Sequence, residues 1–152
     1  MKRLIAGALV LAAVTLGLGA AQAKGKGKEA VLWAAEDLKW VDVPNMKGIS
    51  FVTLWGDMNK GAYGVFVKMA GGTTHPLHTH TADVKGVILS GTWTVTPEGG
   101  TEKKLGAGAY MMVPGGMKHT SACLAGSDCV LFQEGPAKFD VKPVVEKAEK
   151  KK

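Results

Sequence analysis

Residues 72–91 read "GTTHPLHTHTADVKGVILSG" and hold three of the four histidines in this 152-residue chain. Successive side chains of a β-strand point to opposite faces, so His78 and His80 point to the same side of a strand. Two imidazoles placed in this way can reach one ion, and imidazole suits zinc, copper, iron, nickel and manganese alike. The segment therefore predicts a strand with two metal ligands; two surface histidines flanking Thr79 are the alternative.

A third ligand has to come from elsewhere, and His119 is the only histidine outside this segment. It lies in "PGGMKHTSAC" (114–123), just after a Pro-Gly-Gly turn and near the start of an expected strand. An antiparallel barrel would place that strand beside residues 78–80. His119 is therefore the candidate that completes a site of three histidines.

The body of the chain predicts an all-β domain with little helix. Short runs rich in β-branched and aromatic residues are separated by Gly, Pro, Asp and Asn. The turns "PEGGTE" (97–102) and "AGSD" (125–128) are typical of hairpins, and only residues 29–38 and the Lys/Glu tail favour helix. Strands at this spacing predict a sandwich or a barrel. The expected strands are 49–56, 62–70, 84–91, 92–97, 109–114, 118–124 and 129–135.

Two motifs resemble those of the cupin superfamily. Residues 72–91 are similar to its first motif: glycine, five residues, His-x-His, three or four residues, a glutamate, six residues and glycine. Residues 108–123, "GAYMMVPGGMKHTSAC", resemble the second: glycine, five residues, Pro-x-Gly, two residues, histidine, three residues and an asparagine. The resemblance implies a single-domain jelly-roll β-barrel over residues 30–141. "VKGVILSGTW" (84–93) is similar to a subgroup described as a domain of unknown function, which itself resembles ChrR-type cupin domains.

Cupins hold a divalent metal with two histidines and a glutamate from the first motif and one histidine from the second. Carried over, the resemblance implies His78, His80 and His119 as ligands of a Zn, Fe, Mn, Ni or Cu ion. The glutamate position falls on Val84 or, with the longer spacing, on Lys85, and neither side chain ligates a cation. The site therefore lacks the carboxylate that the family usually has.

Three interpretations of the missing carboxylate ligand stay open. The leading one is a site of three histidines with open positions for water or a ligand. Asp83 offers a carboxylate but has the opposite strand parity, and His75 would have to be folded inward from the loop before Pro76. Three neutral imidazoles leave the full charge of a dication, which favours anionic ligands. A pocket whose histidines bind no metal is a further alternative.

The only two cysteines, Cys123 and Cys129, are six residues apart. An even count at short spacing in an exported protein predicts a disulfide, here one that closes "LAGSD" (124–128) as a hairpin. Cys123 stands where the cupin motif usually has asparagine, so a thiolate ligand to the metal is the alternative.

Residues 1–23 are typical of a secretory signal peptide: Lys2 and Arg3, an apolar run and the small-residue cleavage site "AQA". A membrane anchor is the alternative, since the run approaches the length of a short spanning helix. We expect cleavage, no stable membrane anchor, and a secreted or bacterial periplasmic protein. A Gly/Lys linker (24–29) then leads into the barrel.

The net charge of +6 is concentrated in the ends of the chain. Residues 30–140 hold nine Lys against ten Asp plus Glu, whereas the linker and the basic C-terminal tail (142–152) are rich in Lys. Charge in terminal segments is more typical of solvated tails than of a nucleic-acid surface. The body also lacks the basic stripe with interleaved aromatics that single-stranded nucleic acid requires. Nucleic acid is therefore not an expected partner.

The resemblance implies two classes of function, because cupins include both enzymes and binding proteins. One is a metal-dependent enzyme, a dioxygenase-like oxidoreductase or an isomerase, acting on a small oxygen-bearing or anionic ligand. The other is a non-catalytic module that binds or senses a metal or a small molecule. Lys85, Tyr110 and Lys118 are candidates for an acid, a base or an anion contact near the site. A small-molecule partner is expected in both classes, and both are compatible with a homodimer.

Overall fold

The computed structural model describes residues 29–44 and 46–145. The expected signal peptide (1–23), most of the linker (24–29) and the end of the C-terminal tail (146–152) lie outside the described residues. The compact unit that carries the strands begins at Trp33. Within the described ranges, no helix is both long and apolar enough to cross a membrane.

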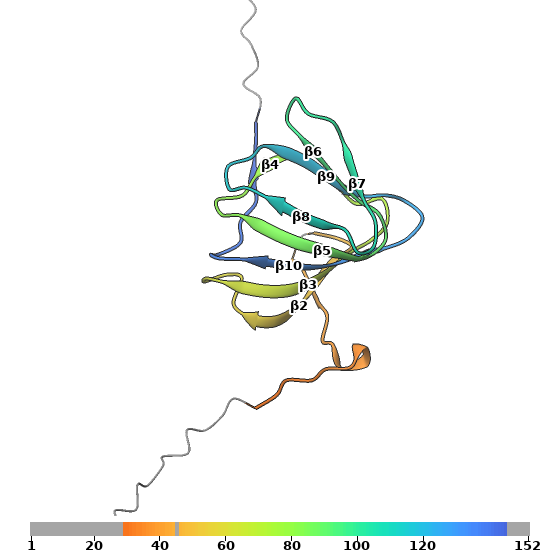
Figure 1. Ribbon diagram of the computed structural model, residues 1–152, viewed down its shortest axis with the longest axis vertical. Helices are drawn as coiled ribbons and strands as arrows, with labels where there is room; N and C mark the ends of the chain where they lie inside the picture. The colour runs from red at the N-terminus through yellow and green to blue at the C-terminus, as the bar shows by residue number, and fades with distance from the viewer. Residues whose placement is uncertain (1–28, 45, 146–152) are drawn as a thin grey trace, which may run out of the picture. The chain divides into compact units, whose positions relative to one another are not determined.

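The described strands form two antiparallel sheets that face each other (Figure 1). The order in the six-stranded sheet is β1-β2-β3-β10-β5-β8, and the order in the five-stranded sheet is β11-β4-β9-β6-β7. This is the all-β jelly-roll architecture expected from the sequence. The strands are β1 Val41–Asp42, β2 Ile49–Gly56, β3 Tyr63–Met69, β4 Thr74–Thr79, β5 Val84–Ser90, β6 Trp93–Pro97, β7 Lys103–Leu105, β8 Tyr110–Val113, β9 His119–Cys123, β10 Cys129–Gly135 and β11 Lys142–Pro143.

The core lies between the two sheets and follows the period of two along the strands. In β10 every second residue, starting at Cys129, is buried. Val65, Ile88 and Leu131 are fully buried and come from β3, β5 and β10, which are neighbours in the six-stranded sheet. Burying apolar surface stabilises by about 25 cal/mol per Å². The alternating pattern therefore fixes which side chains point inward, including those of the site.

All seven predicted strands are present, and none of their ends differs from the prediction by more than one residue. The short edge strands β1, β7 and β11 were not predicted from the sequence. Of these, β11 pairs with β4 although its residues were assigned to the C-terminal tail. The prediction of a helix over residues 29–38 is wrong, since only Ala35–Asp37 form a turn of 3-10 helix. That turn buries no residue, and so short a segment gains too little from packing to offset the cost of helix nucleation.

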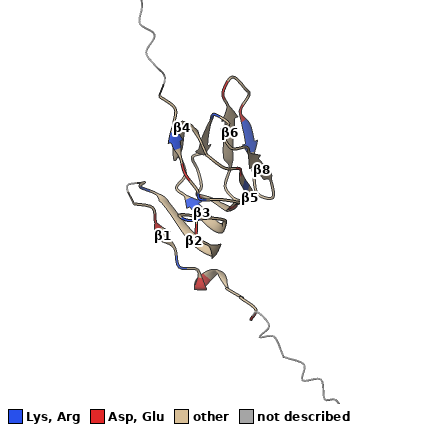
Figure 2. Cartoon of the chain, turned by 90° about the vertical axis from the view of Figure 1, so that its left-hand side faces the viewer, with Lys and Arg blue, Asp and Glu red and all other residues tan. Residues whose placement is uncertain are grey.

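Charged residues are spread over different strands of the described part (Figure 2). Exposed lysines lie on β7 (Lys103 and Lys104) and on β11 (Lys142), and Lys142 pairs with Asp140 at 3.6 Å. Such exposed pairs contribute little to stability, typically less than about 1 kcal/mol.

Cys123 and Cys129 form a disulfide that joins the two sheets. Cys123 ends β9 in the five-stranded sheet, Cys129 begins β10 in the six-stranded sheet, and both are buried. The disulfide predicted from the sequence is present, but it bridges the sheets and does not pair two strands of one hairpin. Gly91 packs against it with φ 76°, and a Cβ at that position would lie 2.9 Å from the Sγ of Cys129. A side chain at position 91 would therefore strain both the turn and the disulfide.

We expect reduction of this disulfide to lower the thermal unfolding midpoint by about 5–10 °C. Closing so short a loop stabilises the folded state by about 2 kcal/mol through the entropy of the unfolded chain. Calorimetry with and without reductant measures the shift. The double variant Cys123→Ala/Cys129→Ala is the control, since its midpoint should not respond to reductant. An unchanged midpoint in the reduced wild-type protein would show that the disulfide is not stabilising.

Candidate metal centre

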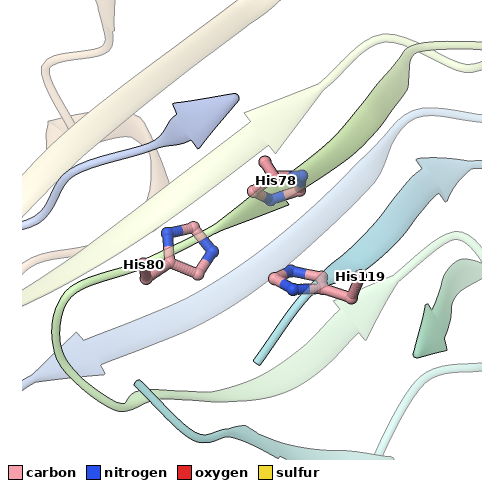
Figure 3. Close-up of side chains that lie close together, drawn as sticks. All are labelled: His78, His80 and His119. Atoms are coloured by element: carbon pink, nitrogen blue, oxygen red, sulfur yellow. The ribbon is translucent and has the colours of Figure 1, made fainter. Parts of the chain in front are cut away.

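Three buried histidines converge inside the barrel (Figure 3). His78 lies on β4, His80 directly follows that strand, and His119 begins β9, opposite His78 in the antiparallel register. The ring centroids are 4.2 Å apart for His78 and His119, 5.0 Å for His78 and His80, and 5.2 Å for His80 and His119. One nitrogen of each ring lies within 4.8 Å of the others. These residues, here called the histidine triad, are positioned to bind a metal ion.

Backbone carbonyls orient all three rings. Each Nδ1 lies within hydrogen-bond distance of a carbonyl oxygen, and because a carbonyl only accepts, the Nδ1–H must be the donor. The acceptors are the carbonyls of Pro76 for His78 (2.7 Å), Asp140 for His80 (2.6 Å) and Met117 for His119 (3.0 Å). In the neutral ring the Nε2 then keeps its lone pair, the arrangement that metal-binding histidines usually show.

The Pro-Gly-Gly turn before β9 is tied to the first motif. The amide of Gly116 donates to the carbonyl of His80 at 2.8 Å, and Gly116 has φ 81°, which glycine adopts without strain. The amide of Gly115 donates to the carboxylate of Asp83 at 2.9 Å. Asp83 therefore contacts the turn and does not belong to the group that could hold a metal. Its placement holds the two motifs, and with them His80 and His119, in register.

Of the two positions where the resemblance places a glutamate, Val84 is the one whose side chain lines the histidine cavity. It is 5% exposed and pairs with Val113 of β8. Lys85 points to the opposite face and is exposed. No carboxylate lines this cavity among the described residues. The usual ligand position is therefore directed inward but carries no charge.

His75 lies in the same cavity but outside the triad. The register of β4 against β9 shifts between His75 and His78, so two residues that are three apart both line the cavity. The Nε2 of His75 is 3.3 Å from the Sδ of Met69, and its ring centroid is 6.1 Å from that of His78. The structure thus brings His75 inward as a separate polar group.

The histidine cavity has a volume of about 70 Å³. Beyond the histidines its polar lining consists of Ser121 and Gln133, each 7% exposed. Neither residue was predicted from the sequence, although strand parity points to both: Ser121 lies two residues after His119, and Gln133 is at an inward position of β10. The lining residues are Met69, His75, His78, His80, Val84, Trp93, Val95, Met111, Val113, His119, Ser121, Gln133, Phe139 and Val141.

Gln133 is held at one end by Tyr63. Its Nε2 donates to the hydroxyl oxygen of Tyr63 at 2.9 Å, and burial raises the pKa of that phenol, which keeps it neutral. The amide oxygen of Gln133 and the hydroxyl of Ser121 make no side-chain hydrogen bond to a described residue. Neither atom is fully buried without a hydrogen-bond partner. Both groups therefore remain open to a ligand in the cavity.

The other polar candidates lie on the outside of the barrel. Tyr110 is 61% exposed. Lys118 pairs with Glu98 at 3.0 Å, and both side chains are about half exposed. Neither of these residues lines the histidine cavity, and Lys85 does not line it either. The structure therefore does not bring them to the triad.

The environment favours the neutral forms of His75, His80 and His119. Burial lowers the pKa of His80 and His119, and the hydrogen bonds from these rings to backbone carbonyls only partly oppose the effect. Burial also lowers the pKa of His75, and charge repulsion from the triad adds to it. Neutral imidazole is the form that binds metal, so the site is ready for a cation at neutral pH.

We expect the metal-free protein to lose stability as the pH falls through and below 6.5, the ordinary pKa of histidine. The unfolded chain takes up protons at these histidines near that pH, whereas the folded protein resists protonation because their pKa values are lowered. The unfolded state then binds more protons, so the free energy of unfolding decreases with falling pH. Urea unfolding at pH 7.5 and 5.5 measures the change. Equal or greater stability at pH 5.5 would contradict the lowered pKa values.

The fold is that of the cupin class, since solved structures described as a cupin-like fold and as a cupin-2 domain match it with TM-scores of 0.62 and 0.61. The polyketide cyclase RemF from Streptomyces resistomycificus is 18% identical, with 80% of this chain and 89% of that chain covered and a TM-score of 0.64. The DMSP lyase DddQ from Ruegeria pomeroyi is 20% identical over 76% and 64% of the two chains, with a TM-score of 0.56. At these identities the likeness shows the fold alone.

The family follows from the sequence match. Residues 28–137 match the family model described as the ChrR Cupin-like domain, and this chain belongs to that family. The Rhodobacter sphaeroides complex of SigE with the anti-sigma ChrR is 21% identical, with a TM-score of 0.53. The match covers 67% of this chain and 50% of that chain, so about two thirds of this chain corresponds to half of the matched chain. A search of the curated proteins found no match.

Proposed function

We propose that this protein holds one divalent metal ion with His78, His80 and His119 and uses it to bind a small oxygen-bearing or anionic ligand. The observation that carries the proposal is the set of three Nδ1–carbonyl hydrogen bonds, which leave three Nε2 lone pairs inside one buried group. A chance cluster of histidines would not need each ring to be fixed in the same tautomer. The metal stays unassigned among Zn, Fe, Mn, Ni and Cu.

The ligand class follows from the charge of the site. A metal held there would act as a Lewis acid that polarises a ligand oxygen. Because Val84 supplies no negative charge, three neutral imidazoles leave the dication uncompensated and favour an anion. Ser121 and Gln133 offer hydrogen bonds from the same cavity. The chain therefore supplies binding and orientation for a small polar head group.

Both an enzyme and a binding module fit this site. RemF and DddQ are named as a cyclase and a lyase, which places enzymes on the same fold, and a dioxygenase-like or isomerase activity is the enzymatic form of the proposal. In that form His75 is the proton acceptor, because it is the one ionisable side chain outside the triad that lines the cavity in the described part. The ChrR complex favours the second form, a sensing module that meets a protein partner.

We further propose that the barrel works outside the cytoplasm after removal of residues 1–23. The charged start, the apolar run and the cleavage site support export. The disulfide between Cys123 and Cys129 supports an oxidising compartment. N-terminal sequencing of protein recovered from a bacterial periplasm tests the proposal, with Lys24 as the expected first residue. Retention of residues 1–23 on the mature protein would overturn it.

The ligand proposal is tested with the cobalt-loaded protein, whose visible absorption reports changes in coordination. Adding azide or formate should shift the spectrum in a saturable way, because an anion enters an open position on the metal. The control is the cobalt-loaded variant Val84→Glu, in which the added carboxylate should weaken anion binding. A wild-type spectrum that does not respond to anions would refute the open three-histidine site. Oxygen consumption with diketone, thiol or phenolic compounds then separates a dioxygenase from a binding module.

A further inference from the structure

A second, larger hollow adjoins the histidine cavity and is lined almost entirely by apolar side chains. We call it the apolar chamber; its volume is about 420 Å³. Beside the side chains that it shares with the histidine cavity, its one polar lining residue is Asn59. The lining residues are Val43, Pro44, Met46, Ile49, Phe51, Met58, Asn59, Val67, Met69, His75, Gln133, Phe139 and Val141.

The two hollows share a wall. The residues that line both are Met69, His75, Gln133, Phe139 and Val141. Two of these are polar, and Gln133 keeps its amide oxygen without a hydrogen bond to a described side chain although the residue is 7% exposed. This amide oxygen is not sealed from solvent, so it is free to accept a hydrogen bond from a ligand. The boundary therefore offers two polar side chains, Gln133 and His75, between the two hollows.

The sizes of the two hollows indicate different parts of one ligand. About 70 Å³ is well below the roughly 300–1,000 Å³ of small-molecule sites, so the histidine cavity takes only a small head group. The apolar chamber falls within that range. Its walls carry no charged residue, so they match an alkyl or aryl group and not a sugar or a peptide with charged side chains.

We propose that the apolar chamber binds the hydrophobic body of an amphipathic small molecule whose carboxylate or other oxygen head group reaches the histidine triad past Gln133 and His75. The inference rests on the proposed function for the head group, but the chamber itself does not depend on the metal. In the form proposed above, without residues 1–23, the ends of the chain are residues 24–28 and 146–152, and these Lys-rich segments are poor occupants for an apolar hollow. The occupant is therefore a separate molecule.

The test is a series of straight-chain carboxylates from acetate to decanoate, titrated into zinc-loaded and zinc-free protein by calorimetry. Each added methylene should tighten binding about three- to fourfold until the chamber is full, because burying one CH₂ in an apolar site has that effect. Zinc should tighten every member of the series by a similar factor, since it contacts only the carboxylate. A flat series would overturn the inference, including the case in which a second copy of the chain fills the chamber.

A matched pair of variants locates the effect. Met46 lines the chamber and is 39% exposed, whereas Met112 is 47% exposed on β8 and lines neither hollow. Met46→Asp should weaken octanoate binding roughly tenfold by placing a charge in the chamber, and should leave acetate binding within about twofold. Met112→Asp should change neither. Equal effects of the two substitutions would show that the chain-length dependence arises elsewhere.

Failure of this inference is distinguishable from failure of the proposed function. If zinc does not bind but octanoate still binds more tightly than acetate in a Met46-dependent way, the metal proposal falls and the chamber stands. If zinc binds and the series is flat, the chamber falls and the metal site stands.

Discussion

Replacing Val84 by Glu is expected to raise the affinity for Zn²⁺ about a hundredfold. The side chain at position 84 already points into the histidine cavity, so a carboxylate there would face a bound cation. At 4 Å and an effective dielectric constant near 20, the attraction is about 4 kcal/mol per pair of unit charges. Desolvation of the buried carboxylate offsets much of it. A net gain of about 2.7 kcal/mol corresponds to the hundredfold change.

The same substitution should destabilise the metal-free protein, because it buries an unpaired carboxyl group. Zinc should then raise the thermal midpoint of the Val84→Glu variant more than that of the wild type. Lys85→Glu is the matched control, since it adds a carboxylate one residue away on the exposed face. If both substitutions change zinc affinity equally, long-range charge and not ligation explains the effect, and the assigned position of the missing ligand is wrong.

Removal of His119 is the second large effect. We expect His119→Ala to lower zinc affinity at least about a hundredfold. Removing a group that only hydrogen-bonds to a metal ligand already lowers metal affinity about ten- to a hundredfold, and His119 is itself a proposed ligand. Competition with a chelating dye measures the affinity. Circular dichroism of the metal-free variant checks that the fold is kept, as His119 is 2% exposed.

His75→Ala is the companion experiment that separates three ligands from four. His75 lies outside the group that could hold the ion, with its Nε2 directed at Met69. Its removal should therefore change zinc affinity by less than about tenfold, the lower limit for loss of an outer partner. A loss as large as that of His119→Ala would make His75 a fourth ligand and overturn the three-histidine site.

The fold and the members of the triad were predictable because they depend on local pattern. Period-two parity places His78 and His80 on one face, and the turn before His119 is encoded by Pro114 and two glycines. The antiparallel pairing of His78 with His119 follows from the jelly-roll topology that the motifs imply. These features can be predicted without knowing the conformation of the irregular segments.

The unpredicted parts depend on irregular backbone or on distant partners. Parity alone would have put His75 and His78 on opposite faces, but the register shift in β4 brings both inward. The carbonyl that orients His80 belongs to Asp140, sixty residues away in a segment without regular structure. The disulfide was expected within a hairpin, whereas Cys123 and Cys129 lie in different sheets. None of these placements leaves a signature in local sequence.

The central claim is that the histidine triad holds one divalent metal ion. The most direct measurement is metal content by atomic emission after exposure to Zn²⁺ and dialysis, for the wild type and for the variant His78→Ala/His80→Ala/His119→Ala. We predict one zinc per wild-type chain and none in the variant. A wild type without stoichiometric zinc, or a variant that retains as much as the wild type, would contradict the claim.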